Sequence, residues 1–171
     1  MQNFLESDSA QALLHLHLPR YEELPILDLY MEQMISIINE NLAPLWPKNS
    51  GPILTPAMVN NYVKLRLVHP PVKKRYSRDH VAYFIVVALL KPVFSISEIS
   101  ALIHRQAQLT TVEAAYNRFC QELELRISDV MAGKASVSPL PLNGEAELLR
   151  AAVMSLANKV YVEKYLEFSE Q

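Results

Sequence analysis

The sequence predicts an all-α fold with a small irregular or two-stranded wing, and three observations support this fold class. Only three of the 171 residues are glycine, whereas sheets and hairpins usually need more glycine at their turns. Helix start signals recur along the chain, and apolar residues follow them at the spacing of one helix face. Half of the residues are apolar and 20% are charged, which suits one globular domain, or a compact domain with a helical extension.

The first predicted long helix follows a weakly periodic start. Residues 1–18 predict a partly ordered arm, and residues 18–25 hold two prolines that indicate a connector. From Ile26, helical spacing predicts an amphipathic helix of about four turns that ends before Pro44. Residues 45–53 are then a loop. The residues that recur at helical spacing are Ile26, Leu29, Tyr30, Gln33, Met34, Ile37, Ile38 and Leu42.

The second predicted helix has a stronger start signal. Thr55 can cap the helix through its hydroxyl, and Pro56 suits the first helical position because its missing N–H needs no partner there. The helix would run to about Leu65, with Asn60, Asn61 and Lys64 on its outer face and an inner face of Met58, Val59, Tyr62, Val63 and Leu65. Pro70 and Pro71 prevent continuation, so residues 67–76 are predicted as a short extended excursion, the wing segment.

Four further helices are predicted after the wing segment. Ser77 is the N-cap of a helix that ends before Pro92 and buries Val81, Phe84, Ile85, Ala88 and Leu89. Residues 95–98 and 110–113 have the capping-box pattern, opening a short helix through Ile103 and a longer one to about residue 131. Residues 133–145 indicate a Pro- and Ser-rich linker, and a last helix follows from Glu145 to about Phe168.

Positive charge is concentrated around the wing segment. Between Lys64 and Arg78 the chain holds six Lys or Arg residues and no acid, although its net charge is −2. The remaining residues therefore carry a net charge of −8. Positive charge near phosphates releases condensed counterions, and this term supplies most sequence-independent affinity for nucleic acids. A charged loop that is merely solvated explains the basic stretch equally well until its placement is considered.

The placement of these residues predicts an interface with double-stranded DNA. Asn suits the hydrogen-bonding edge of adenine, while Lys and Arg suit phosphates or guanine. A helix that offers Asn and Lys, followed by a basic wing, has the components of a major-groove reader with a flank on the phosphate backbone. Tyr76 is expected to anchor the wing by packing and a hydroxyl hydrogen bond, or else to reach a phosphate. The predicted contact residues are Asn60, Asn61, Lys64, Arg66, Lys73, Lys74, Arg75, Tyr76 and Arg78.

Other kinds of site find little support in the sequence. There is no glycine-rich phosphate loop and no nucleophile turn, so we expect neither an enzyme nor a cofactor. Cys120 lies in an apolar helix stripe, which favours a buried structural thiol. His15 and His17 could offer two metal ligands, but no third follows at ligand spacing, so we expect no metal. His69 and His80 are expected to be hydrogen-bonded or solvated.

The sequence also predicts a cytoplasmic protein. A single cysteine cannot form an internal disulfide, and a reducing compartment is the natural interpretation. Glu6 and Asp8 stand where a signal peptide would carry Lys or Arg. The most apolar run, residues 81–90, is about half of the roughly 20 residues that a membrane-spanning helix needs.

Residues 54–103 resemble the DNA-binding half of the MerR family. Val59 and Tyr62 match buried positions of its recognition helix, and Lys74 and Tyr76 match the basic residue and the tyrosine of its wing. The family usually has glycine where Arg66 stands, an Asp at the position of His80, and a tight turn before the recognition helix. Here three prolines lie between Leu42 and Thr55. The remaining matches are Asn60, Asn61, Lys64, Leu67, Val68, Phe94, Ser95 and Glu98.

Residues 18–131 also resemble the bacterial domain-of-unknown-function family 1836, through the phrases LPRYEELPILDLYMEQ, LTPAMVNNYVK and KKRYSRDH. The two resemblances together imply an all-α protein with a MerR-like winged helix-turn-helix core and additional C-terminal helices. The expected parts are an arm and connector (1–25), the winged helix-turn-helix domain (26–106) and C-terminal helices (107–171) that dimerise or complete the core.

The expected function is sequence-specific binding of double-stranded DNA by a homodimer that regulates transcription, because a palindromic site needs a twofold-related pair of readers. An effector ligand is left open, since no residue argues for one. The rival interpretation is a non-enzymatic protein-interaction module whose basic wing binds an acidic partner protein. An enzyme is a third possibility and would require a deep pocket lined with titratable residues.

Overall fold

The computed structural model describes residues 3–134 and 144–170, and across them the protein is helical with no strand. This confirms the all-α class. The predicted linker lies mostly outside these residues. Three 3-10 turns, η1 (Phe4–Glu6), η2 (Tyr21–Glu23) and η3 (Ala43–Leu45), accompany the helices. The helices are α1 (Asp8–Leu14), α2 (Met31–Leu42), α3 (Pro56–Lys64), α4 (Arg78–Leu90), α5 (Ile96–Leu109), α6 (Val112–Met131) and α7 (Gly144–Ser169).

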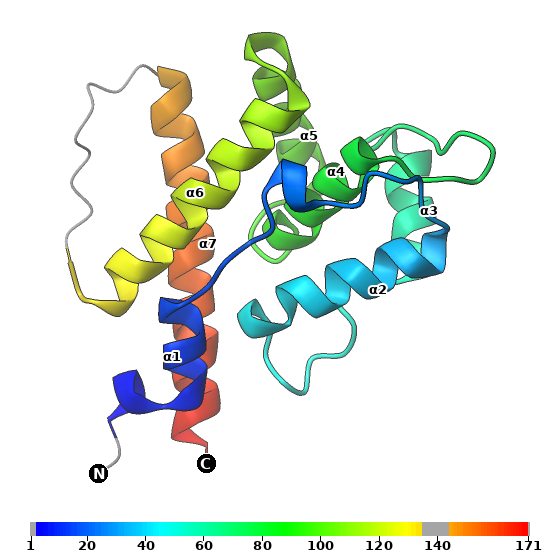
Figure 1. Cartoon of the computed structure of the whole chain (residues 1–171). Helices are drawn as coiled ribbons and strands as arrows, with labels where there is room; N and C mark the ends of the chain where they lie inside the picture. The colour runs from blue at the N-terminus through cyan, green and yellow to red at the C-terminus, as the bar shows by residue number, and fades with distance from the viewer. Residues whose placement is uncertain (1–2, 135–143, 171) are drawn as a thin grey trace.

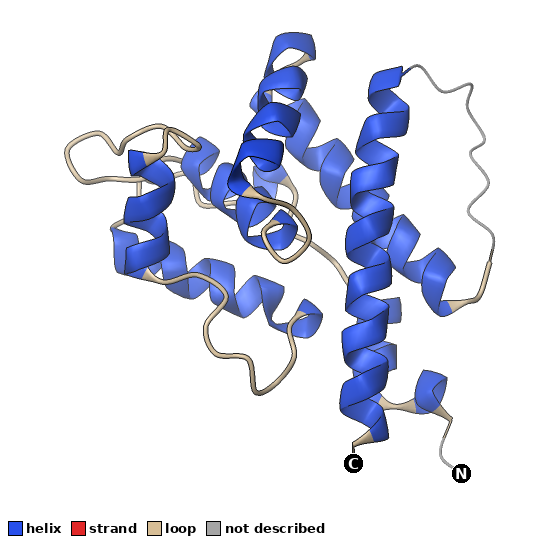
Figure 2. Ribbon diagram, turned by 180° about the vertical axis from the view of Figure 1, so that it is seen from behind, coloured by secondary structure: helices blue, strands red, loops and turns tan. Residues whose placement is uncertain are grey.

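Helix α4 is the centre of the fold. Nine of its 13 residues are buried, which is why its sequence is apolar on all sides rather than amphipathic. It packs against α2 on one side and against α6 and α7 on the other. Figures 1 and 2 show the result: α2, α3 and the wing segment form one side of the molecule, and the long pair α6 and α7 forms the other.

Helix α2 begins five residues later than Ile26, where the sequence predicted its start. Ile26 and Leu27 are 82% and 79% exposed, so neither belongs to the core. The reason is a backbone pairing: the N–H groups of Leu29 and Tyr76 each donate to the other's carbonyl at 2.8 Å, which holds this segment extended. The helix starts only after Tyr30, whose N–H donates to the Gln33 side chain at 2.9 Å. Met34, Ile38 and Leu42 are buried as predicted.

Residues 3–24 are more ordered than the sequence predicted. Ser7 caps α1, which packs on α6, and the ring of Phe4 lies against Tyr161, Tyr165 and Phe168 of α7. The connector that follows is fixed to α6 by Glu124, which accepts the Leu18 N–H at 2.7 Å and a two-pronged pair of bonds from Arg20. The arm was missed because α1 has only seven residues, too few for a clear periodicity.

Helices α5 and α6 meet at a pair of threonines. The capping box of Ser95 and Glu98 opens α5 as predicted, but α5 runs to Leu109 rather than ending near Ile103. Thr110 ends α5, so the N-cap of α6 is Thr111, whose hydroxyl accepts the Ala114 N–H; the predicted capping box from Thr110 is wrong by one residue.

The single cysteine is buried in α6. Cys120 is fully shielded from solvent, and burial raises the pKa of its thiol to about 11. A thiol with that pKa is almost wholly protonated at neutral pH and is a poor nucleophile. The prediction of a buried structural cysteine is confirmed.

The long loop between α2 and α3 is held by the C-terminal helix. Lys164 of α7 is buried, and its ammonium donates to the carbonyl of Trp46 at 2.6 Å and to Glu167 at 3.2 Å. The N–H of Lys48 donates to the same glutamate at 3.2 Å. The contacts with Lys164 and Glu167 therefore tie the loop before α3 to α7.

Candidate nucleic-acid interface

Helix α3 presents the predicted polar face to solvent. The Thr55 hydroxyl accepts the Met58 N–H at 3.3 Å, which confirms the predicted cap. Val59 and Tyr62 are buried against the core, and this orientation leaves Asn60, Asn61 and Lys64 exposed on the opposite face. Met58 and Leu65, predicted on the inner face, are instead 37% and 50% exposed.

Arg66 ends α3 in a conformation that normally belongs to glycine. Its φ is +58°, in the left-handed region. Its N–H donates to Val63 at 3.0 Å and the Leu67 N–H donates to Tyr62 at 2.9 Å, the two bonds of a Schellman C-cap. The exposed Arg66 therefore makes the left-handed cap that a glycine would make, despite its Cβ. The chain then turns so that Leu67 and Val68 are buried.

Arg66→Gly is expected to raise the free energy of unfolding by about 1 kcal/mol, because glycine adopts a positive φ without the steric cost of a Cβ. Arg66→Lys keeps both the charge and the Cβ and serves as the matched control, with an expected change within about 0.5 kcal/mol. Urea unfolding of the three proteins measures both values. A lower stability of Arg66→Gly would contradict the assignment of backbone strain to this position.

The tip of the wing segment is a two-residue turn made of lysines. Val72 and Arg75 exchange backbone hydrogen bonds of 3.1 and 2.9 Å, and between them Lys73 and Lys74 have φ values of +49° and +61°. A two-residue loop with both φ values positive is a type I′ turn, which favours Asn-Gly, Asp-Gly or Gly-Gly. Both lysines are exposed. The turn thus places two lysines in a backbone conformation that disfavours residues with a Cβ atom.

Tyr76 anchors the wing segment from inside the protein. It is 3% exposed, and its ring lies edge-on to His80 and Phe84, with centroids 5.5 and 6.1 Å away. The packing role predicted for Tyr76 is confirmed. The burial removes Tyr76 from the residues that a DNA phosphate could reach, so its place among the contact residues is corrected here.

His80 fastens the other end of the wing segment. Its Nδ1 accepts the Ser77 N–H at 3.0 Å, which closes a capping box at the start of α4, and its Nε2 lies 3.3 Å from the carbonyl of Pro70. Both contacts are satisfied by the neutral ring that carries its proton on Nε2. The sequence suggested a hydrogen-bonded or solvated histidine but not its link to the wing.

The guanidinium groups of Arg75 and Arg78 each lie over the ring of a tyrosine. The guanidinium of Arg75 lies 3.6 Å from the centre of the Tyr30 ring and donates to the Tyr30 hydroxyl at 2.8 Å. Arg78 lies 5.3 Å from the ring of Tyr21, and its Nε is buried without a hydrogen-bond partner among the described residues. Burial and a hydrogen bond to Asp79 raise the pKa of Tyr21 to about 12.

The predicted contact residues therefore fall into two groups. Six are exposed and lie along α3 and its continuation into the wing segment, at the edge of the molecule opposite α7 (Figures 1 and 2). The stretch from residue 41 to residue 78 has no Asp or Glu, so no acid within it offsets their charge. Of the other three, Arg75 and Tyr76 hold the wing segment to residues 28–30, and Arg78 lies beside the ring of Tyr21. The exposed group is Asn60, Asn61, Lys64, Arg66, Lys73 and Lys74.

Sequence reasoning missed the partners that position this surface. Tyr30 and Leu29 were assigned to the buried stripe of a helix, whereas they hold Arg75 and Tyr76. Nothing in the local pattern shows that this segment meets residues 75 and 76.

The described part of the chain has no cluster of three or more His, Cys, Asp or Glu side chains that could hold a metal ion. His17 instead meets Glu23 at 2.9 Å, and His15 bonds to the carbonyl of Gln11 at 2.9 Å. Among the described helices, none combines the length and the apolar character needed to cross a membrane.

Comparison with known proteins identifies one family. The family model described as a domain of unknown function (DUF1836) matches residues 19–119, more than half of the chain. The match covers the connector, α2, α3, the wing segment, α4, α5 and the beginning of α6. No curated protein and no solved structure matches the chain.

Proposed function

This chain belongs to the DUF1836 family, and we propose that it is a MerR-like winged helix-turn-helix protein that binds double-stranded DNA and regulates transcription. In this proposal α2 and α3 are the helix-turn-helix pair, α3 enters the major groove, and the wing segment lies along the phosphate backbone. Asn60 and Asn61 read base edges, and the exposed basic residues bind phosphates.

The observation that carries the proposal is the lysine pair at the wing tip. Non-glycine residues at positive φ cost of order 1–3 kcal/mol each and persist mainly where a function needs them. Lys73 and Lys74 both stand in such a conformation, at the tip of an exposed turn whose neighbours anchor it firmly. Two ammonium groups fixed at an exposed tip suit a phosphate backbone better than a general solubility role, which any loop position could supply.

The homodimer part of the proposal is supported by the outer face of α7. Seven of its exposed residues recur at alternating spacings of three and four, the pattern of a helix–helix seam. None of these seven is charged, and the Ser155 and Asn158 side chains donate to carbonyls of their own helix at 2.9 and 2.8 Å, so they could be buried without losing partners. Helix α6 buries its stripe within the chain. The seam is Leu148, Ala151, Ser155, Asn158, Val162, Tyr165 and Ser169.

The test is selection of bound duplexes from a random pool, followed by gel retardation against the selected sequence. A twofold-symmetric consensus supports a dimeric reader. Affinity should fall roughly 10³-fold or more between 50 and 200 mM salt if six or more phosphates are contacted. No retardation of any duplex at low salt would refute the proposal and leave an acidic partner protein as the better explanation of the basic surface.

Single substitutions should separate base reading from phosphate binding. We expect Lys74→Ala to weaken all duplexes by a similar factor, whereas Asn61→Ala should change the preferred sequence, with a discrimination loss of about 1–3 kcal/mol at one base pair. Lys91→Ala removes an exposed lysine from the far end of α4 and is the control, with affinity unchanged. Uniform weakening by Asn61→Ala would show that α3 does not read bases.

A further inference from the structure

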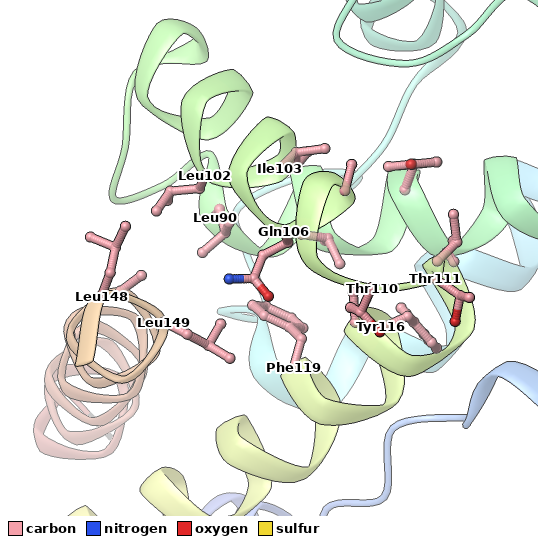
Figure 3. A pocket seen from close by; sticks show the side chains of 17 residues that line it. Leu90, Leu102, Ile103, Gln106, Thr110, Thr111, Tyr116, Phe119, Leu148 and Leu149 are labelled. Carbon is pink, nitrogen blue, oxygen red and sulfur yellow. The ribbon is translucent and has the colours of Figure 1, made fainter. Parts of the chain in front are cut away.

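A cavity of about 350 Å³ lies where α4, α5, α6 and α7 meet (Figure 3). Its volume is within the range of small-molecule sites, roughly 300–1,000 Å³. Each of the four helices contributes apolar side chains to the wall, and the cavity opens beside the junction of α5 and α6. Representative wall residues are Val86, Leu90, Leu102, Ile103, Phe119 and Leu149.

The chemistry of the wall restricts what the cavity can hold. None of the described residues that line it is Asp, Glu, Lys, Arg, His or Cys, so a charged ligand would be desolvated without a counter-charge. The Tyr116 hydroxyl already donates to the carbonyl of Pro19 at 2.8 Å, and the Thr111 hydroxyl caps α6.

Besides the hydroxyls of Tyr83 and Thr110, the wall has another polar side chain that is available to a ligand, Gln106. The carboxamide of Gln106 projects into the cavity beside Phe119 and toward Leu149 (Figure 3). Within the described chain its side chain has no hydrogen-bond partner, so both its N–H and its carbonyl oxygen are open to a ligand. An apolar cavity with one convergent hydrogen-bonding group is the usual form of a small-molecule site.

We propose that this cavity binds an uncharged, mainly aromatic small molecule that exchanges one hydrogen bond with Gln106. Phe119 and the two tyrosines of the wall, Tyr83 and Tyr116, favour an aromatic ligand through ring contacts. Burial of the ligand's apolar surface supplies the affinity, and the carboxamide fixes its orientation.

The same cavity is placed to influence the wing segment, an extension that rests on the proposed DNA-binding function. Helix α4 forms one wall with Val86 and Leu90, and its first two turns hold Ser77, His80 and Phe84, which anchor the wing segment. Helix α7 forms the facing wall with Leu149 and also holds the loop before α3 through Lys164. A ligand between α4 and α7 therefore contacts both supports of the proposed reading surface.

The test of the cavity uses two fluorescent probes with one skeleton. N-phenyl-1-naphthylamine is uncharged and has one N–H donor, and 8-anilinonaphthalene-1-sulfonate is the same skeleton with a sulfonate. We expect the uncharged probe to bind at one molecule per chain and the sulfonate roughly 100-fold more weakly, because no wall residue compensates its charge. Absence of saturable binding of the uncharged probe, or equal affinity of both probes, would overturn the proposal.

Substitutions locate the bound probe. Ala115→Phe, within the wall, and Ala107→Phe, at its exposed rim, should each weaken the uncharged probe at least about tenfold by filling the cavity. Ala114→Phe places the same ring on the exposed neighbour of Ala115, outside the wall, and should leave binding unchanged. Circular dichroism and thermal unfolding confirm that each variant is folded. Probe binding that survives both filling variants would refute this location.

The effect on DNA is measured separately with the sequence selected from the random pool. Saturating N-phenyl-1-naphthylamine should change the apparent Kd for that duplex at least about threefold, and the Ala115→Phe variant should abolish this response. An unchanged Kd at saturation would refute the coupling through α4. If no duplex is bound at all, the fluorescence titration still decides the ligand site, so failure of the DNA proposal and failure of the cavity proposal are distinguishable.

Discussion

Replacing Lys73 and Lys74 together with Asn and Gly is expected to stabilise the protein and weaken its binding to DNA. Both lysines have positive φ values in a type I′ turn, and Asn-Gly is the pair that this turn favours most. Relief of the strain should raise the free energy of unfolding by about 1–2 kcal/mol. Both effects are expected from the same double substitution, because the same two residues have the strained backbone conformation and carry the charges.

The loss of DNA affinity follows from counterion release. Two phosphate contacts contribute about −1.8 to the slope of log K against log salt concentration. These two contacts therefore strengthen binding ~60-fold at 0.1 M salt compared with 1 M salt. Gel retardation across a salt series measures this slope, and urea unfolding measures the stability. The double variant with Arg at both positions keeps charge and strain and should match the original protein in both. A stabilised Asn-Gly variant that binds DNA as well as the original would remove the lysines from the interface.

Lys164→Met is expected to lower the free energy of unfolding by about 3 kcal/mol. The substitution keeps most of the side-chain volume but leaves the carbonyl of Trp46 and the carboxylate of Glu167 without their buried partner. Lys159→Met on the same helix removes the exposed lysine of the Lys159–Glu163 pair and should cost at most about 0.5 kcal/mol. Equal effects of the two substitutions would show that the anchor from α7 to the loop contributes little.

The pH dependence of stability provides a second measure of this anchor. Burial raises the pKa of Glu167, but hydrogen bonds from the Lys48 N–H and the Lys164 ammonium outweigh it, and the pKa is lowered from its ordinary value of 4.5. A lowered pKa in the folded state means that the carboxylate stabilises the fold above pH 4.5 and that this contribution is lost as the pH falls through the folded value. In Lys164→Met this part of the acid dependence should become smaller.

The sequence predicted most strongly the elements that local chemistry determines. Thr55 with Pro56, Ser77, and Ser95 with Glu98 mark helix starts through their own hydrogen bonds, and all three starts are where they were expected. The core of α4 followed from its uninterrupted apolar run. For the same reason the outward position of Asn60, Asn61 and Lys64 was predictable, because burial of Val59 and Tyr62 fixes the rotation of α3.

What could not be predicted depends on contacts distant in the sequence. The apolar spacing after Ile26 is compatible with a helix, and only the pairing of Leu29 with Tyr76 makes that segment extended. Arg75 was expected to be free for phosphate, but its guanidinium lies over the Tyr30 ring and donates to the Tyr30 hydroxyl and to the carbonyl of Asp28. The cavity needs four helices to form it, so Gln106 carried no signal in the sequence; it is one polar residue on an otherwise ordinary helix.

The left-handed conformation of Arg66 is an intermediate case. The resemblance to the MerR family marked the position as one that glycine usually fills, and arginine there left the direction of the chain open. The structure keeps the glycine-like turn, since the Schellman bonds and the burial of Leu67 and Val68 outweigh the local steric cost. The backbone preference of Arg66 itself was therefore a weaker guide to the conformation than the packing of the two residues that follow it.

The pairing of Leu29 with Tyr76 also bears on the order in which the protein can fold. Asp28 and Arg75, the next contact along, are 47 positions apart, so this pairing closes a long loop and carries the entropy cost of that closure. Apart from the bonds of its own tip and those of the α3 C-cap, the wing segment draws its support from residues 28–30 and from the start of α4. During synthesis, the wing segment therefore cannot form its native contacts until residues beyond 80 have left the ribosome. The residues before α2 and the wing segment then become ordered together, in one long-range step.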